Sequence, residues 1–145
     1  MEPFNQSKGT PSMSTSNPLL RFALLGDAVA SGATGLLMAA AASPLSPLLG
    51  LPEPLLRGAG LVCLGYAAIV GWLGARAAPP RAAVLAVVAV NLLWALECLG
   101  LPALGFVAPN ALGLAFLALQ AVVVAGFAAA QWAGLRRAPL AGVTA

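Results

Sequence analysis

The sequence contains no histidine, only two cysteines and few charged side chains. Without histidine, neither a Ser-His-Asp triad nor a Cys-His pair can form. Two cysteines alone also leave too few ligands for a zinc site and do not make a disulfide framework. We therefore interpret Cys63 and Cys98 as small apolar side chains, and we expect neither a cofactor nor a metal ion.

The scarcity of charge also indicates the class of protein. Charged residues make up 8% of the chain and hydrophobic residues 61%, whereas soluble domains have about 25% and about 45–50%. This composition is typical of a membrane protein, whose first partner is the lipid bilayer. The longest basic run is Arg136-Arg137, so no nucleic-acid partner is expected.

Four apolar segments follow one another, each of about 20 residues, the length that crosses ~30 Å of hydrocarbon. They cover residues 19–42, 55–76, 81–101 and 111–133. We predict an all-α, four-helix transmembrane bundle over residues 19–137. A disordered tail of residues 1–18, with Met13 as an alternative start, is expected before it, and a short tail of residues 138–145 after it.

Proline marks the predicted breaks between these segments. Four prolines crowd residues 43–54, and proline this dense stops a helix, so this stretch is predicted to be a loop on the bilayer surface. Three alanines before Ser43-Pro44 also resemble a signal-peptide cleavage site. A retained helix is favoured over a signal peptide, because the apolar stretch is longer than a signal sequence needs and contains Asp27.

The positions of the basic residues predict the orientation. Six of the seven fall on one side of a four-span topology, and only Arg57 falls on the other. Since basic residues concentrate on the cytoplasmic side, both termini are expected in the cytoplasm. The six are Lys8, Arg21, Arg76, Arg81, Arg136 and Arg137.

Asp27 is an acidic residue inside the first apolar segment. It lies ~12 Å along a helix that begins at Leu19, well within the span. An aspartate at the centre of a span costs about 2.5–3.5 kcal/mol, which the leucines, phenylalanine and valine of this segment roughly cancel. Such a residue is a functional hypothesis by default. The alternative is that Asp27 simply pairs with Arg21, Arg76 or Arg81, whose long side chains can reach inward.

Other polar residues can be placed relative to Asp27. Ser31, Thr34 and Gly35 share its helix face, whereas Tyr66, Asn91 and Gln120 fall roughly ten residues from a helix end, near the bilayer midplane. Alternatively, Asn91 and Gln120 only stabilise the contacts between helices by hydrogen bonding. Gln120 and Gln131 share one face of the last segment. The candidate intramembrane polar site is Asp27, Ser31, Thr34, Tyr66, Asn91 and Gln120.

A second candidate site lies near the outer ends of the segments. Arg57 and Glu97 have opposite charge and similar depth, so we predict that they form an ion pair at the outer rim. Arg57 also begins a face of small residues, Gly60, Ala67, Gly71 and Gly74, which would let another helix approach closely.

Four stretches carry a resemblance: LLRFALLGDAVASGATGLLM, PLLRGAGLVCLGYAAIVGWLGAR, AVLAVVAVNLLWALE and NALGLAFLALQAVVVAGFAAAQWAGLRR. Their marks are Asp27, Asn91 with Trp94, Gln120 and the closing Arg136-Arg137. Over residues 19–137 the chain resembles a recurrent type of small four-span membrane protein from high-GC bacteria. The resemblance implies a multi-pass protein of the bacterial inner membrane and implies no activity.

An acidic residue in the first of four helices is also similar to small multidrug-resistance transporters, which exchange protons for cationic drugs through it. This chain is longer, its first loop is rich in proline, and little beyond Asp27 matches. That family is therefore not assigned.

Three hypotheses for the function follow. The first is a structural or accessory membrane protein, whose polar residues stabilise the bundle or bind a second copy or another membrane protein. The second is a small proton-coupled transporter with Asp27 as the proton and cation site. An enzyme is least favoured, because only Asp27 and Glu97 could do acid-base work and they lie at opposite ends of the bundle.

Overall fold

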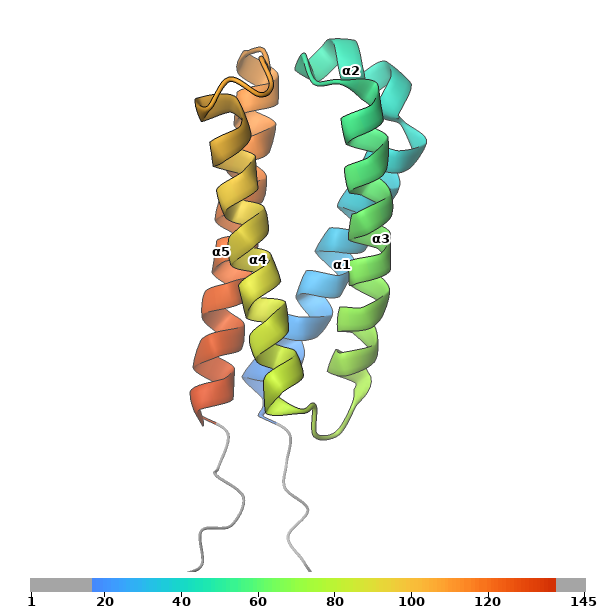
Figure 1. The fold of residues 1–145 in the computed structure, drawn as a ribbon. Coiled ribbons are helices and arrows are strands. Elements are labelled where there is room, and N and C mark those ends of the chain that lie inside the picture. Colours follow the sequence, from blue (N-terminus) through green and yellow to red (C-terminus); the bar gives the residue numbers. More distant parts are fainter. Residues whose placement is uncertain (1–16, 138–145) are drawn as a thin grey trace, which may run out of the picture.

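The computed structural model describes residues 17–137, and every regular element within this range is an α-helix. Of the tail predicted over residues 1–18, residues 1–16 lie outside the described residues, as do the alternative start at Met13 and the tail of residues 138–145. The end of the predicted tail was wrong, because Asn17 caps α1 and Pro18 begins it. Five helices follow one another along the chain (Figure 1). They are α1 (Pro18–Ala40), α2 (Ala42–Leu49), α3 (Glu53–Ala75), α4 (Arg81–Ala103) and α5 (Ala111–Arg137).

Four of these helices are long and apolar enough to cross a membrane. Helices α1, α3 and α4 have 23 residues each and α5 has 27, which gives about 35–40 Å of helix against ~30 Å of hydrocarbon. Large apolar side chains such as Phe22, Leu61, Leu96 and Val122 are exposed on their outer faces. The predicted four-helix transmembrane bundle is confirmed, and the protein is a multi-pass membrane protein.

The four long helices are arranged as two pairs (Figure 1). Helix α1 packs along α3, and α4 packs along α5, while contact between α1 and α5 joins the pairs. Helices α3 and α4 hardly touch, although they are neighbours in sequence. The ends of the helices that carry Arg21, Arg76, Arg81, Arg136 and Arg137 lie together, and we refer to them as the arginine end.

The contact between α1 and α3 depends on glycine. A Cβ atom added at Gly60 would lie 2.5 Å from the backbone N of Ala39 and 2.7 Å from the backbone O of Gly35. A Cβ added at Gly35 would lie 2.8 Å from the backbone O of Gly60. The small-residue face predicted from Gly60 to Gly74 therefore packs against α1, and the two backbones come closest at Gly60.

Adding one methyl group at this contact should separate the two helices. We expect Gly60→Ala to lower the stability of the bundle by about 1–3 kcal/mol, because the clash is with backbone atoms that cannot move aside independently. Gly58→Ala is the matched control, since a Cβ there meets nothing within 4 Å. Thermal unfolding in detergent should show a lower melting temperature for Gly60→Ala only. Equal melting temperatures would contradict the close approach.

Helix α2 corrects the prediction of a loop over residues 43–54. Pro44 lies in the first turn, where its missing N–H would have no intrahelical partner anyway. Pro47 lies inside the helix and removes one backbone hydrogen bond. Burial of Leu49 together with Met38 and Leu56 offsets that loss, so packing overrides the local preference of proline.

The end of α2 is held by the start of α5. Gly50 ends the helix at φ 66°, a conformation that glycine adopts without strain. The Asn110 side chain then donates to the backbone O of Leu48 at 2.8 Å and accepts from the backbone N of Gly113 at 2.9 Å. One asparagine therefore satisfies the end of one helix and the beginning of another.

The apolar core is divided into two layers. One, at the arginine end, contains Leu20, Leu24, Val70, Leu73, Val84, Val87 and Leu135. The other, beneath α2, contains Met38, Ala42, Leu49, Leu51 and Leu56. The second cavity described below reaches into the layer beneath α2, since Met38, Leu51 and Leu56 form part of its wall.

Candidate functional site

Asp27 is fully buried and accepts four hydrogen bonds. Its Oδ1 accepts from Ser31 Oγ at 3.0 Å. Its Oδ2 accepts from Tyr66 Oη at 2.8 Å, from Asn91 Nδ2 at 2.7 Å and from Gln131 Nε2 at 2.7 Å. We refer to these five residues as the Asp27 cluster.

All four long helices contribute to the Asp27 cluster. Ser31 lies one turn beyond Asp27 on α1, Tyr66 comes from α3, and Asn91 and Gln131 come from α4 and α5. Asn91 Nδ2 also donates to Gln131 Oε1 at 3.2 Å, so the two amides are bonded to each other as well as to the carboxylate. The cluster is therefore where the α1–α3 pair is linked to the α4–α5 pair by polar contacts.

No basic side chain takes part in the cluster. Within residues 17–137, the ion pair that forms is between Arg57 and Glu53, and none joins an arginine to Asp27. Arg76, one of the predicted partners, instead lies over the ring of Trp72, 4.5 Å from its centroid. The alternative that Asp27 pairs with Arg21, Arg76 or Arg81 is wrong, because neutral donors occupy both carboxylate oxygens: Ser31 of the same helix bonds Oδ1, and side chains from three other helices bond Oδ2.

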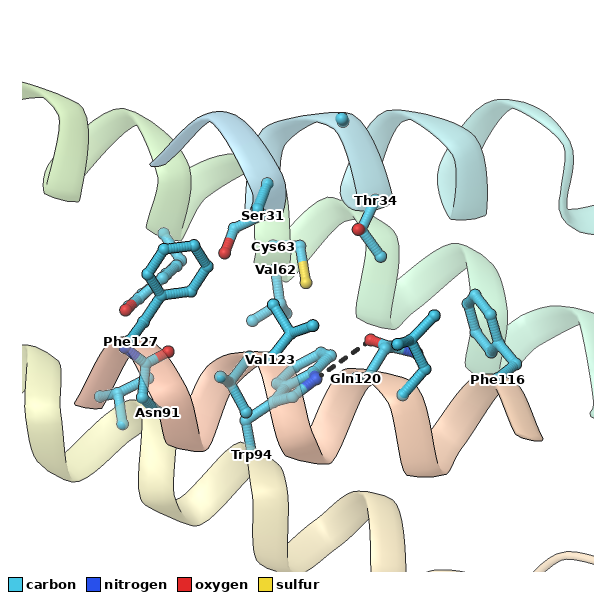
Figure 2. A pocket seen from close by; sticks show the side chains of 16 residues that line it. Ser31, Thr34, Val62, Cys63, Asn91, Trp94, Phe116, Gln120, Val123 and Phe127 are labelled. Atoms are coloured by element: carbon cyan, nitrogen blue, oxygen red, sulfur yellow. Dashed lines mark hydrogen bonds between the residues drawn. The ribbon is translucent and has the colours of Figure 1, made fainter. Parts of the chain in front are cut away.

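A cavity of about 380 Å³ adjoins the Asp27 cluster on the side away from the arginine end (Figure 2). Three members of the cluster, Ser31, Tyr66 and Asn91, line it, while Asp27 itself is screened behind them. Most of the remaining wall is apolar or aromatic, as in ligand-binding pockets of this size. It is formed by Ala30, Ala33, Thr34, Val62, Cys63, Val90, Trp94, Phe116, Leu119, Gln120, Val123, Val124 and Phe127.

The structure brings together four of the six predicted polar site residues: Asp27, Ser31, Tyr66 and Asn91. The other two, Thr34 and Gln120, line the cavity without joining the cluster. Gln120 Oε1 accepts from Trp94 Nε1 at 3.2 Å instead (Figure 2).

Gln131 belongs to the Asp27 cluster but was not included in the predicted site, although it was placed on the same helix face as Gln120. The predicted last segment ended at residue 133, which put Gln131 at the membrane boundary, whereas α5 continues to Arg137. Gln131 lies six residues, or ~9 Å, before that end, so it lies inside the helix rather than at its boundary. Extending the last predicted segment to Arg137 would have placed it there.

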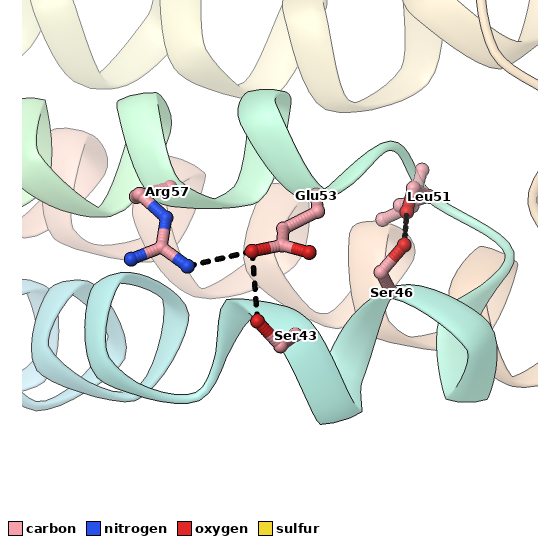
Figure 3. A network of polar contacts seen from close by, with 5 residues as sticks. All are labelled: Ser43, Ser46, Leu51, Glu53 and Arg57. Carbon is pink, nitrogen blue, oxygen red and sulfur yellow. Dashed lines mark hydrogen bonds and ion pairs between the residues drawn. The ribbon is translucent and has the colours of Figure 1, made fainter.

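The predicted outer pair of Arg57 with Glu97 is also wrong. Arg57 Nη2 lies 2.6 Å from Glu53 Oε1, which also accepts from Ser43 Oγ at 2.7 Å (Figure 3). Helix α3 begins at Glu53, two residues earlier than predicted, so Glu53 and Arg57 are one turn apart on one face. Glu97 lines a second cavity between α3, α4 and α5.

The described residues offer no obvious metal site. No group of three or more His, Cys, Asp or Glu side chains within residues 17–137 is placed to hold a metal ion. Cys63 and Cys98 are both free and buried, and each lines a different cavity. The chemistry that the Asp27 cluster shows is hydrogen bonding of neutral side chains to a buried carboxyl group.

The geometry above is the basis for a function, since comparisons with known proteins supply none. The sequence matches no protein-family model, and neither the search of curated proteins nor the search of solved structures found a match.

Proposed function

We propose that the protein is a small proton-coupled transporter of the bacterial inner membrane, in which Asp27 binds a proton or a cation in turn. The proposal rests on one observation. A fully buried carboxylate has neutral partners, and three of these partners, Ser31, Tyr66 and Asn91, form part of the wall of a cavity.

A buried carboxylate needs a counter-charge. Four hydrogen bonds satisfy the oxygens of Asp27 but leave its negative charge uncompensated, and an unpaired charge in an apolar interior is strongly unfavourable. The fixed charges of the described residues do not supply the compensation, because no arginine pairs with Asp27. A mobile positive charge, either a proton or a small cation, meets this need, and exchange of one for the other is the elementary step of coupled transport.

The two oxygens of Asp27 differ in a way that suits such an exchange. Oδ2 is surrounded by three donors, two of them amide groups that can only donate from nitrogen. Oδ1 meets only the Ser31 hydroxyl, which can reverse its role and accept. A proton on Oδ1 would therefore break no hydrogen bond, and Ser31, which lines the cavity, would be next to it.

We also propose that the arginine end faces the cytoplasm, since basic residues of membrane proteins concentrate there. The Asp27 cluster then lies in the cytoplasmic half of the bundle, and the cavity extends from it towards the outer side.

A structural or accessory role is the second candidate, and the hydrogen bonds themselves favour it. All four long helices meet at Asp27, and no buried polar side-chain atom among the described residues lacks a partner. In this role Asp27 would hold the bundle together while carrying a permanent proton, and the exposed apolar faces would bind lipid, a second copy or another membrane protein.

Proton release separates the two candidates. The purified protein in weakly buffered solution with a pH-sensitive dye would receive benzyltrimethylammonium, a permanently charged probe without an exchangeable proton. Binding next to Asp27 should release up to about one proton per chain from the native protein, and none from Asp27→Asn. Glu53→Gln, which removes an exposed carboxylate at the other end of the bundle, should behave like the native protein.

Flux measurements complete the test. In liposomes, Asp27→Asn should abolish uptake of the probe driven by a pH gradient while the variant remains folded. Native protein that releases no proton, or an Asp27→Asn variant with undiminished driven uptake, would contradict the transport proposal and leave the structural role.

A further inference from the structure

A second cavity, of about 390 Å³, lies beside the first, between α3, α4 and α5 beneath α2. Four residues belong to the walls of both: Val62, Trp94, Phe116 and Gln120. The two cavities are therefore neighbouring chambers along one path. We refer to the cavity beside the Asp27 cluster as the inner chamber and to the second as the outer chamber.

The hydrogen-bonded pair of Trp94 and Gln120 stands at the boundary between the chambers. The indole Nε1 donates to Gln120 Oε1 at 3.2 Å, and in Figure 2 this bond crosses the pocket between Asn91 on one side and Phe116 on the other. The bond links α4 to α5, so it holds the indole in a defined position in the wall of both chambers.

Among the described residues, the outer chamber contains an acidic side chain and no basic one. Glu97 is the acidic residue of its lining, and no lysine or arginine of residues 17–137 lines either chamber. Arg57, the basic residue at the same end of the bundle, is engaged with Glu53 on the exposed side of α3. Trp94 and Phe116 add aromatic faces, which attract cations.

The depth of Glu97 strengthens this reading. Glu97 lies 16 residues after Arg81, or ~24 Å along α4, and six residues before its end, so it is within the spanning helix. An acidic side chain at that position is unfavourable towards lipid and is expected to face a cavity or a functional path. Glu97 is an exposed residue in the wall of the outer chamber, so a charged ligand can reach it there.

We propose that the outer chamber is a binding site for an amphiphilic organic cation, held by Glu97 and the face of Trp94, and that it is the entry site for the inner chamber. The assignment of this substrate class rests on the proposed transport function, whereas binding in the outer chamber itself does not require Asp27. The carboxylate draws the positive charge, the apolar wall receives the body of the molecule, and the ligand passes Trp94 to reach the Asp27 cluster.

The test uses Trp94 as its own reporter. Substituting Trp72→Phe and Trp132→Phe, both at exposed positions near the arginine end, leaves Trp94 as the single tryptophan of the chain. The protein in phosphatidylcholine nanodiscs is titrated with (4-bromobenzyl)trimethylammonium, whose bromine quenches indole fluorescence. The neutral carbon isostere, 1-bromo-4-neopentylbenzene, is the control for partition into lipid.

The expected result is saturable quenching by the cation, with a dissociation constant that rises about tenfold in Glu97→Gln, equivalent to ~1.4 kcal/mol. The matched control Glu53→Gln should leave the constant unchanged, and the isostere should quench all variants alike. Equal quenching by cation and isostere, or no effect of Glu97→Gln, would overturn the proposal and identify the chamber as a lipid-filled groove.

Asp27→Asn in the same background separates the two proposals. It should abolish the proton release described above and leave quenching of Trp94 by the cation within about twofold. Quenching that depends on Glu97 without any proton release would refute coupled transport and retain the binding site. Proton release without quenching that depends on Glu97 would refute the binding site in the outer chamber and retain coupled transport.

Discussion

Replacing Asp27 by leucine should cost the bundle about 2–5 kcal/mol. The leucine would fill the space but accept no hydrogen bond. Tyr66 Oη and Gln131 Nε2 would lose the partner that each has in the structure, and a buried donor without a partner costs about 1–3 kcal/mol. Asn91 would keep only its bond to Gln131.

Asp27→Asn is the matched control for this prediction. Asparagine has the same shape. Its carbonyl oxygen can take the place of Oδ2 and accept from Tyr66, Asn91 and Gln131, while its amide group, in the place of Oδ1, donates to the Ser31 hydroxyl, which can also accept. We expect the loss of stability to stay within about 1 kcal/mol. Unfolding of the purified protein by titration with sodium dodecyl sulfate measures both variants. A leucine variant as stable as the native protein would show that the cluster does not hold the helices together.

The second large effect is a difference in stability between substitutions of the two glutamines of α5. Gln131 is fully buried and bonds both Asp27 and Asn91, so Gln131→Leu should cost about 1–3 kcal/mol. Gln120 bonds only Trp94 at the edge of a cavity, so Gln120→Leu should cost about 0.6 kcal/mol, the average for a hydrogen bond between transmembrane helices.

A double-mutant cycle tests the reason for this difference. Because Asp27 and Gln131 share a hydrogen bond, the combined variant Asp27→Leu/Gln131→Leu should lose less stability than the sum of its parts, by about 0.5–3 kcal/mol. Asp27→Leu combined with Gln120→Leu should be additive within about 0.5 kcal/mol. Equal costs for the two glutamines, or coupling of Asp27 to Gln120, would contradict the structure of the cluster.

The predictions from sequence succeeded where a property depends on composition or on the spacing of residues along one helix. The four spans could be recognised because crossing hydrocarbon requires a minimum apolar length, whatever the neighbours are. The stripe of Asp27 and Ser31 and the glycine face of α3 could be recognised because positions three and four residues apart share a helix face. Each of these rules acts within a single segment.

The errors arose where a residue's role depends on a partner far away in the chain. Residues 43–54 have the proline content of a loop, yet most of them form α2, because Leu49 finds apolar neighbours on α1 and α3. Arg57 was assigned to Glu97 by charge and depth, but α3 begins early enough to place Glu53 one turn away. Gln131 was omitted because the predicted end of the last helix placed it at the membrane surface.

By itself the sequence determined that this is a four-span helical membrane protein with an aspartate inside its first span. Only the tertiary structure decided what surrounds that aspartate: neutral donors from all four long helices, no arginine, and a cavity beside it. The physical reason is the range of the interactions. Hydrophobic length and helix periodicity are local, whereas the partners of Asp27 are up to 104 residues away and are selected by how the two helix pairs pack.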